Sequence, residues 1–188
     1  MKRLFIGIPI RSVQVVHTTE IWKKDQNLNQ NLLKWVNSEN WHITLVFLGS
    51  TDESVLPEIQ ELIEESFASI AAFSTRLTVP GVFPNFNNPK VLWLGIESIQ
   101  ALISAQIRLV EKLQQNGFVL ESKPLKPHLT LARIKNASHR TSLNSLIERY
   151  QDTDFGPVSI DRVILYESKS TPDGPVYLPL FVKELELI

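Results

Sequence analysis

The tetrapeptide His-x-Thr-Leu occurs twice in the chain, at residues 42–45 and 128–131. The two histidines are 128 − 42 = 86 positions apart, which is close to half of the 188 residues. Each copy lies in an apolar run, and the run around the first copy, residues 41–48, is rich in β-branched and aromatic residues, a composition typical of β-strands. The pattern therefore predicts a degenerate internal duplication in which each half contributes one such strand.

Each motif places an imidazole and a hydroxyl on the same side of its strand, because residues i and i+2 share a face. His42 is expected beside Thr44, and His128 beside Thr130, while the neighbouring apolar residues point into the core. Two such strands facing each other would form a cleft that holds two imidazoles and two hydroxyls.

This set of groups suits in-line displacement at phosphorus. A neutral imidazole takes a proton from water and a protonated one gives a proton to the leaving oxygen, since histidine titrates near neutral pH. The hydroxyls can donate hydrogen bonds to the non-bridging oxygens. A single histidine on a strand is more often structural, but a matched pair is a specific signal. His17 and His139 have no such context and are interpreted as surface or structural residues.

The composition excludes several other chemistries. The chain has no cysteine, which rules out disulfides, thiolate zinc sites and cysteine nucleophiles and fits a cytoplasmic protein. His42 and His128 alone are too few ligands for a structural zinc, so no metal and no other cofactor is expected. The sequence contains neither a Gly-rich phosphate loop nor a Ser-centred nucleophile elbow. The first apolar run ends at Pro9 and is too short for a membrane span.

The formal net charge is −1, but the charges are unevenly distributed. Every charged residue between 52 and 65 is acidic, and every one between 123 and 140 is basic. The basic stretch contains His128, and a local positive field there would suit an anionic substrate. A solvated surface that happens to be basic is an equally good interpretation.

Hydrophobic periodicity predicts alternating strands and helices. Strands are expected at residues 2–9, 33–36, 41–48, 72–79, 91–96, 127–134, 158–168 and 176–187, and helices at 12–26, 52–69, 98–117 and 138–150. Asp52 and Ser98 are expected helix N-caps, residues 81–90 a loop, and residues 170–175 a hairpin connection. No linker divides the chain, so residues 1–188 are expected to form a single domain of two lobes.

The motifs and their surroundings resemble the two-histidine phosphoesterase superfamily. Within it, the chain is most similar to the bacterial and archaeal RNA 2′,3′-cyclic phosphodiesterases, formerly called 2′-5′ RNA ligases. The likeness covers nearly the whole chain and is carried by RLFIGI (3–8), WHITLVFLG (41–49), GVFP (81–84), VLWLG (91–95), KPHLTLAR (126–133), YES (166–168) and GPVY (174–177).

The resemblance implies a bilobal α+β fold. Two antiparallel sheets would flank a central cleft, with helices on the outside and a pseudo-twofold relation between the halves. It implies a monomeric, metal-independent phosphodiesterase domain, cytoplasmic and without a membrane partner. Its substrate would be RNA with a 2′,3′-cyclic phosphate end, or a small cyclic nucleotide, and its product a 2′-phosphomonoester.

The resemblance also implies a role for each motif residue. His42 would be the general acid that protonates the leaving 3′ oxygen, and His128 would be the general base. Thr44 and Thr130 would hold the phosphate. The residues themselves leave open which histidine is the acid, because the two motifs are equivalent in their chemistry.

Phe47 and Arg133 would sandwich the nucleobase by this resemblance, in a stacking arrangement that tolerates many bases. Each lies five residues after its motif histidine, and strict alternation puts an i+5 residue on the opposite face of a strand. A bulge or an early strand end must therefore intervene in both motifs if Phe47 and Arg133 are to join the site. Otherwise Phe47 would be a core residue and Arg133 a surface residue.

Three other functions use the same residues. One is a related cyclic phosphodiesterase activity in tRNA processing, and a second is ligation of 2′-5′ linkages as the reverse reaction. The third is a non-catalytic module that binds RNA ends, although intact histidines and threonines in both motifs argue against it.

Overall fold

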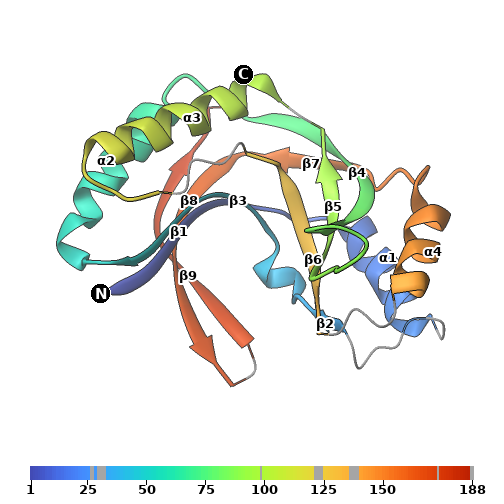
Figure 1. The fold of residues 1–188 in the computed structure, drawn as a ribbon. Helices are drawn as coiled ribbons and strands as arrows, with labels where there is room; N and C mark the ends of the chain where they lie inside the picture. The colour runs from blue at the N-terminus through green and yellow to red at the C-terminus, as the bar shows by residue number, and fades with distance from the viewer. Residues whose placement is uncertain are drawn as a thin grey trace.

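The computed structural model describes residues 1–25, 28, 33–97, 99–120, 125–135, 140–172 and 174–186. Within these ranges the chain forms nine strands, four α-helices and two short 3-10 turns (Figure 1). The strands are β1 (Lys2–Pro9), β2 (Leu33–Trp35), β3 (His42–Thr51), β4 (Phe73–Phe83), β5 (Val91–Ile96), β6 (His128–Ile134), β7 (Pro157–Ile160), β8 (Arg162–Thr171) and β9 (Gly174–Glu184). The helical elements are α1 (Val13–Lys24), η2 (Ser38–Asn40), η3 (Glu53–Val55), α2 (Leu56–Phe67), α3 (Gln100–Gln115) and α4 (Arg140–Tyr150).

Some sequence predictions fall on residues outside these ranges. They concern Gln26, Ser98, Lys123, Ser138, His139, Asp173 and Leu187.

The strands form two antiparallel sheets, which confirms the predicted fold class. The first sheet has the order β3-β1-β8-β9, and the second has the order β2-β6-β5-β4-β7. The first motif strand, β3, lies at the edge of the first sheet. The second motif strand, β6, lies beside the short edge strand β2. Each sheet therefore carries one His-x-Thr-Leu motif.

When β2, β7 and β9 are left out, the order of strands and α-helices repeats along the chain. The unit β1–α1–β3–α2–β4 is matched by β5–α3–β6–α4–β8, and the motif strand is the middle strand of each unit. Each motif strand pairs with the first strand of its own unit, β3 with β1 and β6 with β5. The last strand of each unit pairs instead with the first strand of the other unit, β4 with β5 and β8 with β1. The two repeats thus exchange one strand each.

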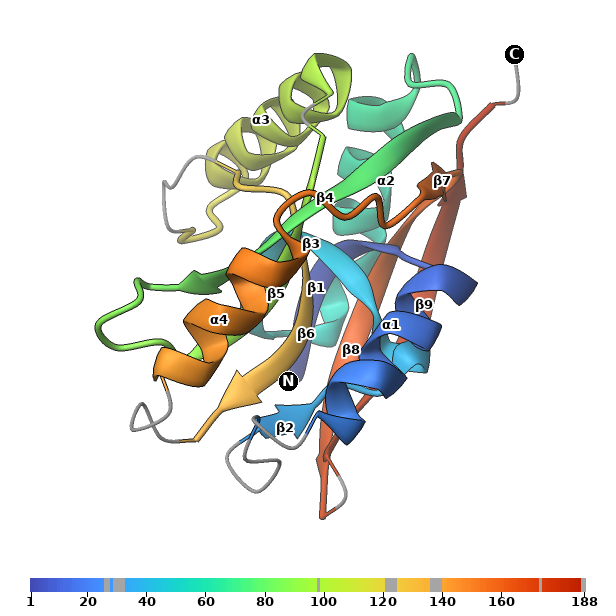
Figure 2. The ribbon, with the colours of Figure 1, turned by 90° about the vertical axis from the view of Figure 1, so that its right-hand side faces the viewer.

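The helices are exchanged in the same way (Figures 1 and 2). Helix α3 lies over the first sheet beside α2, and Arg108 of α3 donates to the carbonyl of Ser66 in α2 at 3.0 Å. Helix α1 lies beside α4 at the second sheet, where the rings of Trp22 and Tyr150 meet edge to face at 5.0 Å. One continuous cluster of buried apolar side chains joins these layers. None of the helices in the described ranges is long and apolar enough to cross a bilayer.

Two predicted strand boundaries were wrong because long-range pairing decides them. Strand β4 continues to Phe83, into the predicted loop, because its pairing with β5 extends to Phe83 opposite Val91. The single strand predicted over residues 158–168 is two strands separated at Asp161. The first, β7, pairs with β4 in the second sheet, and β8 pairs with β1 in the first. The chain therefore changes sheets at a point that local composition does not mark.

Asp52 caps a different element from the predicted one. Its Oδ1 accepts a hydrogen bond from the backbone N–H of Ser54 at 2.9 Å, which starts the 3-10 turn η3. Helix α2 begins later, at Leu56, with Pro57 in its first turn, where a missing N–H costs no hydrogen bond.

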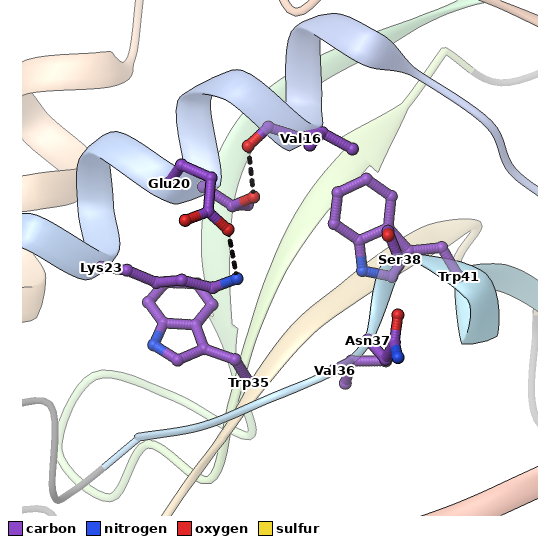
Figure 3. A pocket seen from close by; sticks show the side chains of 9 residues that line it. Val16, Glu20, Lys23, Trp35, Val36, Asn37, Ser38 and Trp41 are labelled. Atoms are coloured by element: carbon purple, nitrogen blue, oxygen red, sulfur yellow. Dashed lines mark hydrogen bonds and ion pairs between the residues drawn. The ribbon is translucent and has the colours of Figure 1, made fainter.

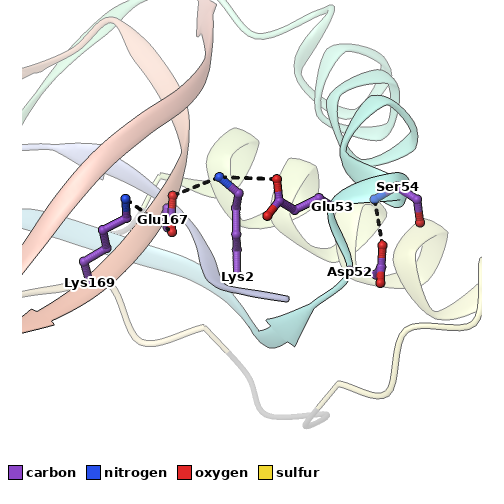
Figure 4. Close-up of polar contacts among 6 residues, drawn as sticks. All are labelled: Lys2, Asp52, Glu53, Ser54, Glu167 and Lys169. Atoms are coloured by element: carbon purple, nitrogen blue, oxygen red, sulfur yellow. Dashed lines mark hydrogen bonds and ion pairs between the residues drawn. The ribbon is translucent and has the colours of Figure 1, made fainter.

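Glu53, Glu64 and Glu65 of the acidic stretch form ion pairs. Lys2 Nζ lies 3.2 Å from Glu167 and 3.6 Å from Glu53 (Figure 4). Glu64 and Glu65 of α2 lie 2.7 Å from Lys183 and 2.5 Å from Lys112. These carboxylates therefore contact cations of their own lobe.

Candidate active site

The two motif strands show the same burial pattern over six residues. From each histidine onward, the side chains are half-buried, buried, half-buried, buried, buried and exposed. The residues flanking each motif threonine are almost fully buried, as predicted: Ile43, Leu45, Leu129 and Leu131. Each histidine therefore shares the opposite, partly open face of its strand with the threonine two residues on.

A register shift interrupts both strands directly after the threonine. In the β1–β3 ladder, Gly7 pairs with Thr44 and Ile6 with Val46, so Leu45 is passed over. In the β5–β6 ladder, Trp93 pairs with Thr130 and Leu92 with Ala132, so Leu131 is passed over. Each motif strand thus contains a β-bulge at the same position.

These bulges interrupt the strict alternation of faces, which is the condition for Phe47 and Arg133 to share a face with the motif histidines. Because one residue is passed over, Phe47 and Arg133 return to the face of the motif histidines. Phe47 is 68% exposed, which excludes the interpretation that it belongs to the core. Its ring centroid lies 6.1 Å from that of Phe5, which in turn lies 4.8 Å from the His42 ring.

Both histidine rings are held by a backbone carbonyl two residues upstream. The Nδ1 atom of His42 lies 2.7 Å from the carbonyl oxygen of Asn40, and Nδ1 of His128 lies 2.7 Å from that of Lys126. A carbonyl oxygen only accepts, so Nδ1 carries the proton and donates in both rings. Nε2 is therefore the nitrogen that can take up or release a proton.

The His42 ring is surrounded by aromatic side chains from three strands of the first sheet. Phe5 of β1 lies at 4.8 Å, Tyr177 of β9 meets the ring edge to face at 5.1 Å, and Tyr166 of β8 lies at 6.4 Å. Sequence reasoning gave none of the three a role. Each of the three lies in a segment that carries the family resemblance, residues 3–8, 166–168 or 174–177. Their place in these segments is the sequence signal that could have identified them.

The His128 ring has fewer aromatic neighbours. Phe83 of β4 meets it edge to face at 4.9 Å, and Trp93 of β5 lies at 6.2 Å. Gly81 lies opposite Trp93, and a Cβ there would come within 2.4 Å of the indole. A larger residue at position 81 would therefore displace Trp93 from its place beside the histidine.

The surroundings lower the pKa of both imidazoles below the usual 6.5. Burial is the main cause in each ring, and the hydrogen bond to the backbone carbonyl opposes it. A positive charge on His128 lowers the pKa of His42 further, so the two rings are close enough to interact electrostatically. Burial raises the pKa of Tyr166 to about 12 and also raises that of Tyr177, so both phenols keep their protons at neutral pH.

These shifts predict a bell-shaped profile of kcat/KM against pH with its maximum below pH 6.5. If one ring acts as the acid and the other as the base, the active form carries one proton on the two rings, and a lowered pKa moves both limbs of the profile toward acid. An anionic substrate favours the protonated ring, so the kcat profile should peak at higher pH than kcat/KM. Steady-state rates on a 2′,3′-cyclic nucleotide measure both profiles. A kcat/KM maximum above pH 7 would contradict the prediction.

Basic side chains near the motifs remain available to an anion. Arg133 and Arg3 both lower the pKa of Tyr177 against the effect of burial, which places the two guanidiniums near this phenol. Lys34 of β2 pairs in register with Arg133, and all three cations are exposed. Within the part of the chain that the structure describes, none of the three forms a salt bridge. Arg133 is thus the member of the basic stretch that lies beside two further exposed cations, where it can contact an anion.

Gly7 leaves the space that the His42 ring needs. A Cβ at this position would lie 2.9 Å from the carbonyl oxygen of Ile43 and 3.4 Å from Cδ2 of His42. Gly7→Ala should therefore push β3 by a few tenths of an ångström and reduce kcat by about tenfold. Steady-state rates test this, with Ser50→Ala at the exposed far end of β3 as the control. An unchanged kcat in Gly7→Ala would contradict it.

A cavity of about 420 Å³, which neither motif histidine lines, lies between α1 and the segment that leads into β3 (Figure 3). Its walls include Val16, Lys23, Trp35 and Trp41. Among the residues that the structure describes, no group of three or more histidine and carboxylate side chains is arranged to hold a metal ion.

The sequence is similar to one protein family and to curated proteins that share one name. Residues 13–172 match the family model described as the 2′-5′ RNA ligase superfamily. The RNA 2′,3′-cyclic phosphodiesterase of Methanocaldococcus jannaschii is 36% identical over 176 residues, covering 93% of this chain and 96% of that protein. The enzyme of the same name from Thermotoga maritima is 33% identical over 192 residues, covering 98% and 96%.

Solved structures share the fold. The protein TT0787 of Thermus thermophilus superposes with a TM-score of 0.76 at 25% identity, over 98% of both chains. Escherichia coli LigT complexed with 3′-AMP gives a TM-score of 0.73 at 21% identity, also over 98% of both chains, and this likeness concerns the fold alone. With a family model matching most of its length and relatives more than 30% identical across nearly all of it, the chain belongs to the 2′-5′ RNA ligase superfamily.

Proposed function

We propose that the protein hydrolyses the 2′,3′-cyclic phosphate end of RNA to a 2′-phosphomonoester. The observation that carries this proposal is the pair of equivalent imidazoles, each with Nδ1 bound to a backbone carbonyl and Nε2 left for proton transfer. The activity of the curated relatives, which are RNA 2′,3′-cyclic phosphodiesterases, supports it.

In the proposed reaction, one imidazole removes a proton and the other supplies one. Nε2 of neutral His128 takes a proton from water as the water oxygen attacks phosphorus. The bond between phosphorus and O3′ breaks, and Nε2–H of protonated His42 gives its proton to O3′. The phosphate stays on O2′, and exchange with solvent returns both rings to their starting states. The choice of His42 as the acid follows the family resemblance.

The other motif residues bind the substrate in this proposal. Thr44 and Thr130 lie on the histidine faces of their strands and donate hydrogen bonds to the non-bridging oxygens. Phe47 and Arg133, which the bulges return to those faces, stack on the two sides of the nucleobase. No metal ion is required, because the acid, the base and the phosphate-binding donors are all side chains of the protein.

The substrate we propose is RNA rather than a free cyclic nucleotide. Arg3 and Lys34 are exposed cations on the same strands or ladders as the motif residues, and each could contact a phosphate upstream of the cyclic end. A mononucleotide has no such phosphate. The kcat/KM for RNA should therefore fall more steeply with salt than the kcat/KM for a mononucleotide.

The deciding experiment is incubation with an RNA that ends in a 2′,3′-cyclic phosphate, with and without EDTA. A 2′-phosphate product formed at the same rate in both reactions is the expected result. A 3′-phosphate product would reject the direction of ring opening, and loss of activity with EDTA would reject metal independence. Binding without turnover would favour the non-catalytic RNA-end module.

The family description also names 2′-5′ ligation, in which a 5′-hydroxyl would take the place of water in the same ring opening and the bond to O3′ would break. Adding an RNA with a free 5′-hydroxyl to the same reaction tests it. A 2′-5′-linked product would add ligation to the proposed activity.

A further inference from the structure

The passed-over residues of the two bulges, Leu45 and Leu131, receive hydrogen bonds from different sources. The carbonyl oxygen of Leu131 accepts from the backbone N–H of Val36, just after β2, at 2.8 Å. The carbonyl oxygen of Leu45 accepts from the side-chain Nε2 of Gln106 in α3 at 3.2 Å. The second sheet has an extra strand outside its motif strand, whereas β3 is the edge of the first sheet. Gln106 thus supplies the donor that β2 supplies in the other half.

Gln106 is an unusual residue for its place in α3. It is 6% exposed and lies on the helix face formed by Leu102, Ala105, Leu109 and Leu113, all of which are buried. A buried amide is costly unless it is hydrogen-bonded, so an apolar residue would be the default choice on this face. The hydrogen bond from Gln106 to the carbonyl of Leu45 in the bulge accounts for an amide on this buried face.

We propose that Gln106 is a positioning residue that holds the bulge of β3 and so keeps Phe47 on the face of His42. Loss of the donor leaves a buried carbonyl unpaired, which favours flattening of the bulge or entry of water. Either change moves Phe47, because the bulge alone sets the side of the strand to which it points. The role rests on the proposed function, in which Phe47 stacks on the nucleobase.

His42 and Thr44 are held independently of Gln106. They precede the bulge and pair with Pro9 and Gly7 of β1, and the carbonyl of Asn40 fixes the His42 ring. A weakened bulge should therefore impair substrate binding more than the chemical step. This split between KM and kcat separates a positioning role from a general loss of stability.

The test compares Gln106→Leu with Arg108→Met. Arg108 lies on the same helix and also donates to a backbone carbonyl, that of Ser66 at 3.0 Å, but it does not contact β3 through this bond. Gln106→Leu should raise KM for a 2′,3′-cyclic nucleotide about fivefold and change kcat less than twofold. Arg108→Met should change neither. An unchanged KM in Gln106→Leu, or an equal effect in both variants, would overturn the proposal.

A second comparison uses the Phe47→Ala background. If Gln106 acts through Phe47, then Gln106→Leu should add nothing to the KM of Phe47→Ala, and a further fivefold rise would reject this route.

Amide hydrogen exchange provides a measurement that does not depend on activity. Residues 45–47 should exchange faster in Gln106→Leu than in the wild-type protein or in Arg108→Met. Unchanged exchange would overturn the proposal even if the protein proves to have another substrate. Absence of turnover by the wild-type protein would instead reject the proposed function, and the exchange measurement would still decide the role of Gln106.

Discussion

Replacing either motif histidine by alanine is expected to reduce kcat by about 10²–10⁴-fold. His42→Ala removes the proposed donor to O3′, and His128→Ala removes the acceptor of the water proton. Both rings lie on the partly open faces of their strands, outside the cluster of buried apolar side chains. The folded state should therefore persist, as judged by circular dichroism and thermal unfolding, while turnover of a 2′,3′-cyclic nucleotide is lost.

His17→Ala is the matched control for these variants. His17 is an exposed histidine on α1, outside the candidate site, and its removal should leave kcat unchanged. The double variant His42→Ala/His128→Ala should be little worse than either single variant, because acid and base act in one step. Undiminished turnover in either single variant would refute the catalytic assignment.

Replacing a motif threonine by valine should reduce kcat by about 10²–10³-fold. Valine keeps the shape and β-branching of threonine, so Thr44→Val and Thr130→Val preserve the strand while removing the hydroxyl. The loss should fall on kcat more than on KM, because the proposed hydrogen bonds strengthen as charge moves onto the phosphoryl oxygens. Steady-state kinetics on a 2′,3′-cyclic nucleotide separate the two constants.

Serine variants at the same positions keep the hydroxyl and lose only the methyl group. Thr44→Ser and Thr130→Ser should therefore retain kcat within about fivefold of wild type. If the serine and valine variants lose activity equally, the methyl group matters rather than the hydroxyl, and the threonines do not act as hydrogen-bond donors.

The parts of the fold that depend on local pattern could be predicted from the sequence. Periodicity identified the helices and most strands, and alternation placed His42 with Thr44 and His128 with Thr130 on shared faces. Partner choice could not be predicted, because it depends on contacts between distant segments. The split of one predicted strand into β7 and β8, which join different sheets, is the main example.

The two bulges correspond to only a weak signal in the sequence. Leu45-Val46 and Leu131-Ala132 are pairs of adjacent apolar residues where strict alternation allows only one. The site residues that sequence reasoning missed, such as Tyr177 and Gln106, come from β9 and α3, far from the motifs along the chain. Their proximity to the motifs results from the assembly of the sheets.

The exchange of strands and helices between the two repeats has a consequence for the ancestry of the chain. A single repeat would hold a motif strand and its neighbour but would lack the next strand of its sheet, which the other repeat supplies. Such a half-length protein could complete its sheets only by associating with a second copy across a twofold axis. The geometry is therefore that expected if the gene of a strand-swapped homodimer was duplicated and the two copies were fused, with one histidine inherited from each subunit.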